Sequence, residues 1–233
     1  GRTAQFVATQ RQFRNPKLNW LYVRMGVIPK VQFHTDPRCV MNIMRVLKKD
    51  GTVVIFPAGQ TSMWGVPGNI APSIEYAKAA GMISQCALSI THSPIHTVEY
   101  YVNMAKQLIE LGADEICIKD MAGIGRPAFL GKIVAGIKAI KDIPIQYHSH
   151  AGPGFNMASI LEVCKAGCDY VDVGMEPLSW GTGHADVISV QAMLKDAGFK
   201  VPEINMEAYM KVRSLVQEFM DDFLGLYISP KNR

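Results

Sequence analysis

Several features that define large classes of protein are missing from this sequence of 233 residues. It has no charged-then-apolar leader, and no apolar run approaches the ~18 residues that a membrane span needs. Its formal net charge of +4 is too small to indicate nucleic-acid binding. Its five cysteines include no CxxC pair, and three of them stand in apolar runs, which favours buried thiols in a reducing compartment. We therefore expect a cytoplasmic protein that binds no nucleic acid.

What the sequence does contain is typical of a globular α/β protein. The apolar content of 48% and the charged content of 19% are ordinary for such proteins. The length suits one α/β domain with a sizeable core, or two small domains. The pattern of the chain changes near residue 73, so the sequence predicts two segments, 1–72 and 73–233.

In the second segment, short apolar runs alternate with amphipathic helices. Strands are predicted at 84–91, 115–119, 143–150 and 169–175, and helices at 97–112, from 127, through 160–167, at 187–194 and at 206–223. Thr97 is suited to the N-cap of the first of these helices, and Gly112 to its end. Pro127 is suited to the start of the second. This alternation indicates βα units and a parallel sheet.

The first segment is richer in basic residues. These are Arg2, Arg11, Arg14, Lys17, Arg24, Lys30, Arg38, Arg45, Lys48 and Lys49. A helix is predicted at 37–49, a strand at 52–59, and a Gly/Pro/Ser-rich loop at 59–72.

Groups that can bind a metal ion gather at the ends of two predicted strands. His148 and His150 are two apart on one strand, so both side chains leave the same face and can act as paired ligands. Lys119 ends the preceding strand, which places it on the same rim of a parallel sheet. Hydrogen-bonding surface histidines, and a lysine paired with Asp120, are the structural alternatives. Three carboxylates around the fourth strand add to the cluster: Asp169, Asp172 and Glu176.

Two long motifs resemble the carboxyltransferase domain of biotin-dependent enzymes such as pyruvate carboxylase and oxaloacetate decarboxylase. They are CALSITHSPIHTVEYYVNMAKQLIELGADEICIKDMAG and HSHAGPGFNMASILEVCKAGCDYVDV. The resemblance covers about 73–233. It implies a partial (β/α)8 TIM-barrel-like parallel sheet with flanking helices.

The same resemblance implies site residues and partners. His148, His150 and Lys119 would be metal ligands, with Lys119 carboxylated to give an anionic oxygen, and Lys119 and Asp120 would be catalytic. The divalent metal would be Zn, Mn, Co or Mg, and it would polarise the keto oxygen of a 2-oxo acid, pyruvate or oxaloacetate. Biotin would arrive on a partner domain or subunit, and we expect a homo-oligomer. The family's first-strand aspartate and its proton-shuttling threonine have no recognised counterparts here, which predicts an incomplete site.

The first segment is similar instead to an α/β fragment of a lysophospholipid (1-acylglycerol-3-phosphate) acyltransferase. Residues 56–62 read FPAGQTS, with Ala58 where that family has glutamate. His34 and Asp36 are separated by one residue and do not form the family's His-x4-Asp motif. The resemblance implies peripheral contact of 1–72 with anionic lipid, at the inner face of a membrane, although a solvated basic face is the simpler interpretation of these charges.

Four interpretations therefore stay open. They are a biotin-dependent carboxyltransferase or decarboxylase, a metal-dependent lyase of the aldolase type that uses no biotin, an acyltransferase-derived lipid-binding protein, and an inactive chimeric fragment. Folding of two partial families in one chain could be helped if residues 52–56 add an edge strand beside the four predicted strands of the second segment.

Overall fold

A computed structural model describes residues 4–9, 13–14, 16–30, 36–49, 52–54 and 70–222 of the chain. The chain divides into two compact units, Gly1–Ser73 and Ile74–Arg233. The motif at 56–62 and His34, on which the acyltransferase resemblance depends, lie outside the described residues.

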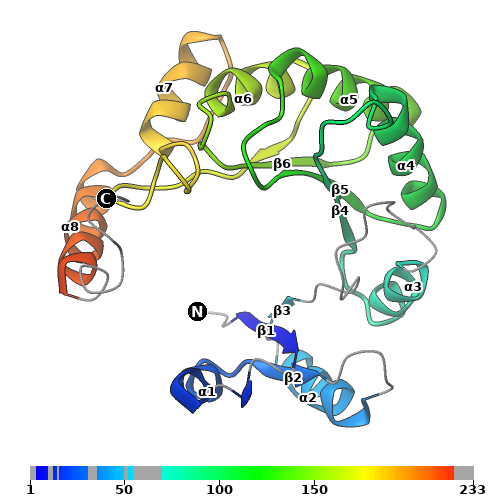
Figure 1. The fold of residues 1–233 in the computed structure, drawn as a ribbon, viewed down its shortest axis with the longest axis vertical. Coiled ribbons are helices and arrows are strands. Elements are labelled where there is room, and N and C mark those ends of the chain that lie inside the picture. Colours follow the sequence, from blue (N-terminus) through cyan, green and yellow to red (C-terminus); the bar gives the residue numbers. More distant parts are fainter. Residues whose placement is uncertain are drawn as a thin grey trace. The chain divides into compact units, whose positions relative to one another are not determined.

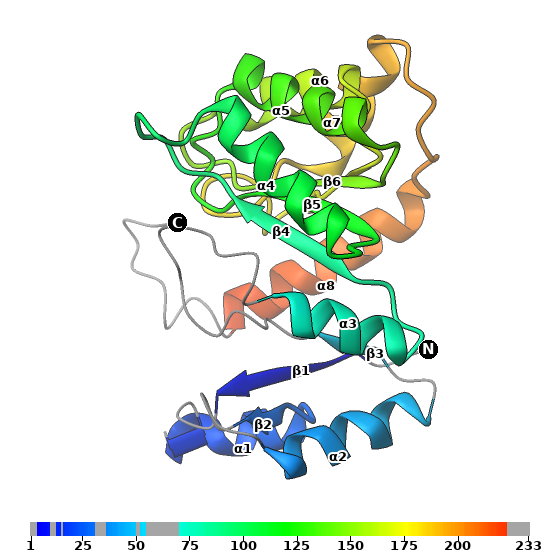
Figure 2. The ribbon, with the colours of Figure 1, turned by 90° about the vertical axis from the view of Figure 1, so that its right-hand side faces the viewer.

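The second unit is built on a four-stranded parallel sheet. Its strands are β4 (Gln85–Ser89), β5 (Glu115–Asp120), β6 (Ile145–Ser149) and β7 (Tyr170–Val171), in the order β4-β5-β6-β7. Helices α4 (Val98–Glu110), α5 (Pro127–Ile140) and α6 (Asn156–Lys165) connect successive strands, and α7 (Val187–Asp196) follows the sheet. These helices line the outer side of the curved sheet (Figures 1 and 2). The predicted partial TIM-barrel-like fold is therefore confirmed for this unit.

Local sequence signals set the helix ends in this unit. The Thr97 hydroxyl accepts a hydrogen bond from the backbone N–H of Tyr100 at 3.2 Å and so caps α4. Just beyond the other end of α4, Gly112 has a φ of +98°, a conformation that residues other than glycine rarely adopt. Pro127 occupies the first turn of α5, where no N–H is needed. The predicted capping residues are thus confirmed.

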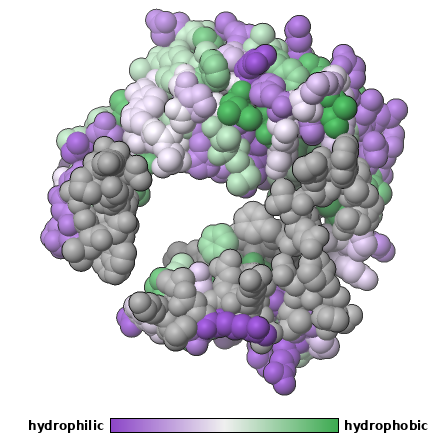
Figure 3. Space-filling view, in the orientation of Figure 1, coloured by the Kyte–Doolittle hydropathy of each residue, from purple (hydrophilic) through white to green (hydrophobic). Residues whose placement is uncertain are grey.

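The core of the second unit lies between the sheet and its helices. Alternate residues of the strands, such as Ile116, Ile118 and Tyr147, are completely or almost completely buried. They meet the buried side of α5, which is made by Leu130, Ile133, Val134 and Ile137. Each fully buried side chain of this size contributes roughly 1.5–3 kcal/mol. The strand positions between them face the other way, and most of them carry polar groups. Hydrophilic side chains cover much of the outer edge over α4 and α5 (Figure 3).

The first unit has a small parallel sheet of its own. Strands β1 (Ala4–Thr9), β2 (Ile28–Lys30) and β3 (Thr52–Val54) pair in the order β2-β1-β3, with helices α1 (Pro16–Arg24) and α2 (Pro37–Leu47) between them. The expectation that residues 52–56 extend the sheet of the second segment is wrong for the strand that the structure describes, because β3 pairs with β1. The predicted helix at 37–49 is confirmed as α2, whereas β1, β2 and α1 were not predicted.

Two further helices complete the described residues. Helix α3 (Ala71–Ala79) begins inside the segment predicted to be a loop, and α8 (Met206–Asp222) follows α7. In the described part of the chain, no helix combines the length and the apolar character needed to cross a bilayer. All five cysteines are free thiols. Cys86 and Cys117 are buried as predicted, whereas Cys164, the third cysteine in an apolar run, is only partly buried.

Candidate metal centre

Parallel pairing of β5 and β6 brings the predicted site residues to one edge of the sheet. Lys119 and His148 are register partners near the carboxyl ends of these strands. Because partners in a parallel pair point to the same face, both side chains lie on the face opposite the helices. The ring of His150, just beyond β6, lies 5.4 Å from the ring of His148 between centroids.

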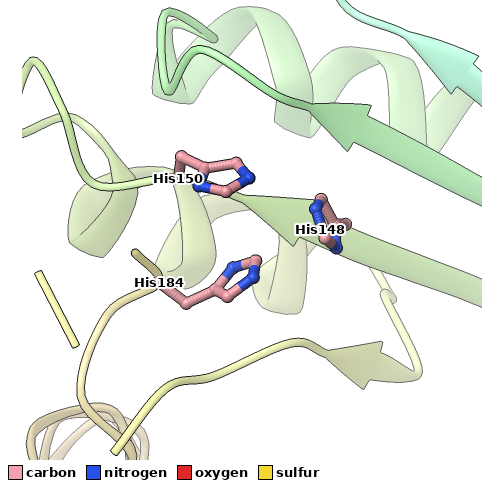
Figure 4. Close-up of side chains that lie close together, drawn as sticks. All are labelled: His148, His150 and His184. Atoms are coloured by element: carbon pink, nitrogen blue, oxygen red, sulfur yellow. The ribbon is translucent and has the colours of Figure 1, made fainter. Parts of the chain in front are cut away.

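A third histidine, not predicted from the sequence, completes the cluster. His184 lies in the loop before α7, and its ring centroid is 4.6 Å from that of His148 and 4.8 Å from that of His150. One nitrogen of each ring can be chosen so that all three lie within 4.8 Å of one another. Figure 4 shows the rings grouped, two from the end of β6 and one from the facing loop. Sequence spacing gave no signal for His184, because the loop that carries it returns to β6 only in the folded chain.

Hydrogen bonds fix the proton on two of these rings. The Nδ1 atom of His150 lies 2.5 Å from the carbonyl oxygen of Thr182, and the Nδ1 atom of His184 lies 2.8 Å from that of Ser149. A carbonyl oxygen can only accept, so each Nδ1 must carry the hydrogen. In a neutral ring the Nε2 atom then keeps its lone pair, which is the form that a metal ion binds.

His148 is oriented by a carboxylate instead. Its Nδ1 atom lies 2.6 Å from Oδ2 of Asp172, an arrangement common around metal-binding histidines. Burial lowers the pKa of His148 below its ordinary value, although the hydrogen bond and charge of Asp172 oppose this effect. The ring is therefore suited to bind a cation through Nε2 at neutral pH.

The predicted catalytic residue Asp120 lies on the opposite face of β5. Its side chain is buried, and its two carboxylate oxygens accept the backbone N–H groups of Ile124 at 3.0 Å and Gly125 at 2.7 Å. The contacts indicate that Asp120 anchors the loop after β5, and a catalytic role for it stays a prediction. Gly123 in this loop has a φ of +67°, and a Cβ there would collide with the carbonyl oxygen of His150. The KDMAG motif therefore packs the loop against the histidine cluster.

Of the three carboxylates that the sequence placed around the fourth strand, only Asp172 contacts the histidines among the interactions described. Asp169 accepts from the N–H of Ile145 at 2.8 Å and pairs with Lys138 at 2.9 Å. Glu176 pairs with Arg213 of α8 at 2.9 Å. These two carboxylates hold structural elements together.

No cysteine belongs to this cluster, because the group of close candidate ligand atoms found among the described residues consists of His148, His150 and His184. Burial raises the pKa of both Cys86 and Cys117 to about 11, so their thiols keep their protons at neutral pH. The donor set is therefore three imidazoles, with the amine of Lys119 on the same rim.

Sequence similarity identifies the family. The family described as HMGL-like matches residues 59–216, more than half of the chain. The chain belongs to the HMGL-like family. This HMGL-like chain is 38% identical over 151 residues to a pyruvate carboxylase subunit from Methanocaldococcus jannaschii, a match that covers 62% of the chain and 27% of that protein. It is 39% identical over 138 residues to the methylmalonyl-CoA carboxyltransferase 5S subunit of Propionibacterium freudenreichii subsp. shermanii, covering 57% and 27%.

A solved structure shares the same fold. The carboxyl transferase domain from Rhizobium etli pyruvate carboxylase with pyruvate superposes with a TM-score of 0.58 and 26% identity, covering 64% of this HMGL-like chain and 26% of that one. The matches thus span about a quarter of the length of these relatives. The family match begins inside the motif at 56–62, and these similarities lend no support to the acyltransferase resemblance of the first segment.

Proposed function

We propose that this chain carries part of the site of a biotin-dependent carboxyltransferase, which moves a carboxyl group between a 2-oxo acid, pyruvate or oxaloacetate, and biotin on a partner domain. The observation that carries the proposal is the cluster of three imidazoles whose Nδ1 atoms are all engaged with oxygen atoms. The names of the relatives, a pyruvate carboxylase subunit and a methylmalonyl-CoA carboxyltransferase subunit, support this choice of reaction.

In this proposal His148, His150 and His184 hold a divalent cation through Nε2. Three imidazoles with no thiolate suit a borderline ion such as Zn²⁺ or Co²⁺ better than Mg²⁺, which prefers oxygen ligands. When bound, such an ion polarises the keto oxygen of a 2-oxo acid and so favours loss or gain of its carboxyl group. The outer hydrogen bonds to Thr182, Ser149 and Asp172 keep the three rings turned for this task.

Lys119 contributes charge to the same rim. An ammonium group beside the three imidazoles would repel a cation, whereas a carbamate on the same Nζ atom is an anion that attracts one. We therefore expect Lys119 to be carboxylated when the metal is bound. Protein equilibrated with ¹³C-bicarbonate should give a carbamate carbon signal by NMR, and Lys119→Arg should abolish it.

Metal analysis of the purified full chain tests the site directly. The wild-type chain should bind one divalent ion per molecule, and His148→Ala together with His150→Ala should abolish binding without changing the far-ultraviolet circular dichroism. His96→Ala is the matched control, because His96 contacts Ser93 in the β4–α4 loop, outside the histidine cluster. Stoichiometric metal in the double variant would refute the assignment.

Turnover of oxaloacetate separates the open interpretations. A carboxyltransferase should show decarboxylation that biotin stimulates and that the double histidine variant loses. Turnover that needs the metal but ignores biotin would favour the lyase of the aldolase type. The oligomeric state is measured on the same sample by light scattering, where a homo-oligomer is expected.

A second candidate function belongs to the first unit. On α2, the side chains of Val40, Met41 and Met44 are 55%, 56% and 42% exposed, and the exposed Arg38 and Arg45 lie beside them. An exposed apolar strip bordered by arginines suits the surface of an anionic bilayer, where each basic residue contributes about 1 kcal/mol. We propose that this face of α2 makes peripheral contact with anionic lipid.

Vesicle sedimentation tests the lipid contact. The chain should pellet with vesicles that contain phosphatidylserine and stay in solution with pure phosphatidylcholine, and salt should weaken the binding. Arg38→Glu with Arg45→Glu should abolish it. Lys200→Glu with Lys211→Glu, two exposed positions of the second unit, changes the net charge equally and should have little effect. Equal loss in both double variants would refute a specific role for α2.

A further inference from the structure

The face of the second unit's sheet that its helices leave uncovered carries a continuous row of hydrogen bonds that ends on a histidine of the cluster. Gln85 on β4 donates through Nε2 to Oε1 of Gln146 on β6 at 2.7 Å. Gln146 in turn donates through Nε2 to Oδ1 of Asp172 at 2.5 Å, and Oδ2 of Asp172 accepts from Nδ1 of His148 at 2.6 Å. We call Gln85, Gln146, Asp172 and His148 the glutamine row.

Chemistry fixes the direction of every bond in the glutamine row. An ionised carboxylate only accepts, so Gln146 must turn its NH₂ group towards Asp172 and its oxygen towards Gln85. The second hydrogen of the Gln85 amide is directed to Oε2 of Glu115 at 2.9 Å. A flipped Gln146 amide would set oxygen against oxygen at Asp172 and NH₂ against NH₂ at Gln85. The row therefore has a single low-energy arrangement.

The side chain of Asp172 depends on this row for its orientation. Its backbone is held by its own N–H, which donates to the carbonyl oxygen of Tyr147 at 3.0 Å, next to His148. Its carboxylate has one oxygen on the imidazole and the other on Gln146. Without Gln146, one of these two bonds is lost and the carboxylate can rotate away from the ring.

We propose that Gln146 is a positioning residue that holds Asp172 against His148 and so keeps the imidazole in the Nδ1–H form, with Nε2 turned to the metal position. As far as the metal is concerned, this inference rests on the proposed function. His150 and His184 need no side chain to hold their rings, because their Nδ1 atoms donate to backbone carbonyl oxygens. Of the three rings, His148 is thus the one whose orientation depends on side chains.

The ¹⁵N chemical shifts of the His148 ring in metal-free protein test the positioning role. The wild type should show the Nδ1–H tautomer alone, whereas Asp172→Ala and Gln146→Met should show a mixture of tautomers, larger in the first. Gln217→Met is the matched control, because Gln217 also donates to an aspartate, Asp221, but on the exposed side of α8. His148 shifts in Gln146→Met that equal those of the wild type would overturn the proposal.

Affinity for Zn²⁺, measured by competition with a chromogenic chelator, gives the second readout. Gln146→Met should weaken binding about 10-fold and Asp172→Ala on the order of 10–100-fold, as outer ligands of metal sites commonly do. In the Asp172→Ala background, Gln146→Met should cause no further loss, because it acts through that carboxylate. Fully additive losses would overturn the inference.

A second variant and a metal-independent measurement keep the test decisive. If Gln146→Met fails to fold, Gln85→Met at an exposed position breaks the same row from its far end, and it should shift the tautomers in the same direction by less. If the wild type binds no Zn²⁺, the proposed metal function fails, and the tautomer measurement alone decides the positioning role.

Discussion

Residues 1–73 carry ten Lys or Arg and two Asp or Glu, a formal charge of +8, whereas residues 74–233 carry fourteen and eighteen, a charge of −4. Both units alternate parallel strands with helices. In the first unit β1 has six residues but β2 and β3 have only three each, whereas in the second unit β4, β5 and β6 have five or six and β7 has two. Among the residues described in the first unit, the buried apolar side chains are Ile28, Cys39 and Val53. Among the described residues, βα alternation in the first unit therefore goes with few buried apolar side chains, since a large core also needs several long strands that bury a continuous layer.

The largest expected contrast between the units concerns core truncation. Changing Ile133, which is completely buried on the inner side of α5, to Ala should cost about 2–5 kcal/mol, because a cavity replaces the lost side chain. Met41→Ala on the exposed face of α2 should change the free energy of unfolding by no more than about 0.5 kcal/mol. Urea unfolding followed by circular dichroism measures both. Similar losses would mean that the first unit has a core that its described residues do not reveal.

Two glycine turns, one in each unit, give the next contrast. Gly26 and Gly123 have φ values of +68° and +67°, so Ala at either position costs about 1–2 kcal/mol of backbone strain. A Cβ at Gly26 meets the flexible end of Gln5, but at Gly123 it meets the backbone of His150. Gly123→Ala should therefore cost about 2–4 kcal/mol and also weaken metal binding. Equal costs for the two variants, with unchanged metal affinity, would contradict the packing of this loop against the cluster.

Helix caps can show whether the units unfold separately. Asp36 caps α2 by accepting from the N–H of Cys39 at 3.1 Å, and Thr97 caps α4 in the same way. Changing either residue to Ala should cost about 1 kcal/mol. If the units are independent domains, as the sequence predicts, calorimetry should show two transitions, with Asp36→Ala shifting one and Thr97→Ala the other. A single transition that both variants shift equally would refute this.

The smallest expected effect concerns acid. The N–H and hydroxyl of Ser84 and the ammonium of Lys78 lower the pKa of Asp114 below its ordinary value. Because the folded pKa is lower than the unfolded one, this stabilisation is present above pH ~4 and is lost as the pH falls through the folded value. The carboxylate is partly exposed, so Asp114→Asn should cost roughly 0.5–1 kcal/mol at pH 7.

The pH dependence of the free energy of unfolding tests this effect. Unfolding of the second unit should be less pH-dependent between pH 5 and pH 2 in Asp114→Asn than in the wild type. The first unit has only two acidic residues, so its stability should change less over the same range. An unchanged slope in the variant would show that Asp114 adds nothing to acid sensitivity.

Much of the second unit could be predicted because its signals are local. Period-two and helical patterns, an N-cap at Thr97 and a proline at 127 all act within a few residues, and the structure has the elements that they indicate. The pairing of His148 with His150 follows from their spacing on one strand. In the first unit β2 has only three residues, too few for such a pattern, and the six-residue β1 was missed as well.

The remaining features depend on contacts between distant parts of the chain. His184 joins the cluster because a loop folds back and donates to the carbonyl oxygen of Ser149, 35 residues earlier. The family resemblance implies a catalytic Asp120, which stays a prediction, but no residue pattern reveals that its carboxylate accepts hydrogen bonds from backbone N–H groups. A sequence motif does not show which backbone groups a side chain will contact in the folded chain.

The three imidazoles differ in how far point mutation can disturb them. His150 and His184 donate to carbonyl oxygens of Thr182 and Ser149, and a substitution at either position leaves that main-chain acceptor in place. His148 donates to a side chain, which a single codon change at Asp172 removes. Natural variation that adjusts this centre should therefore concentrate at position 172 and at the glutamines behind it. His148 is thus the ring whose orientation a single substitution at its acceptor can change.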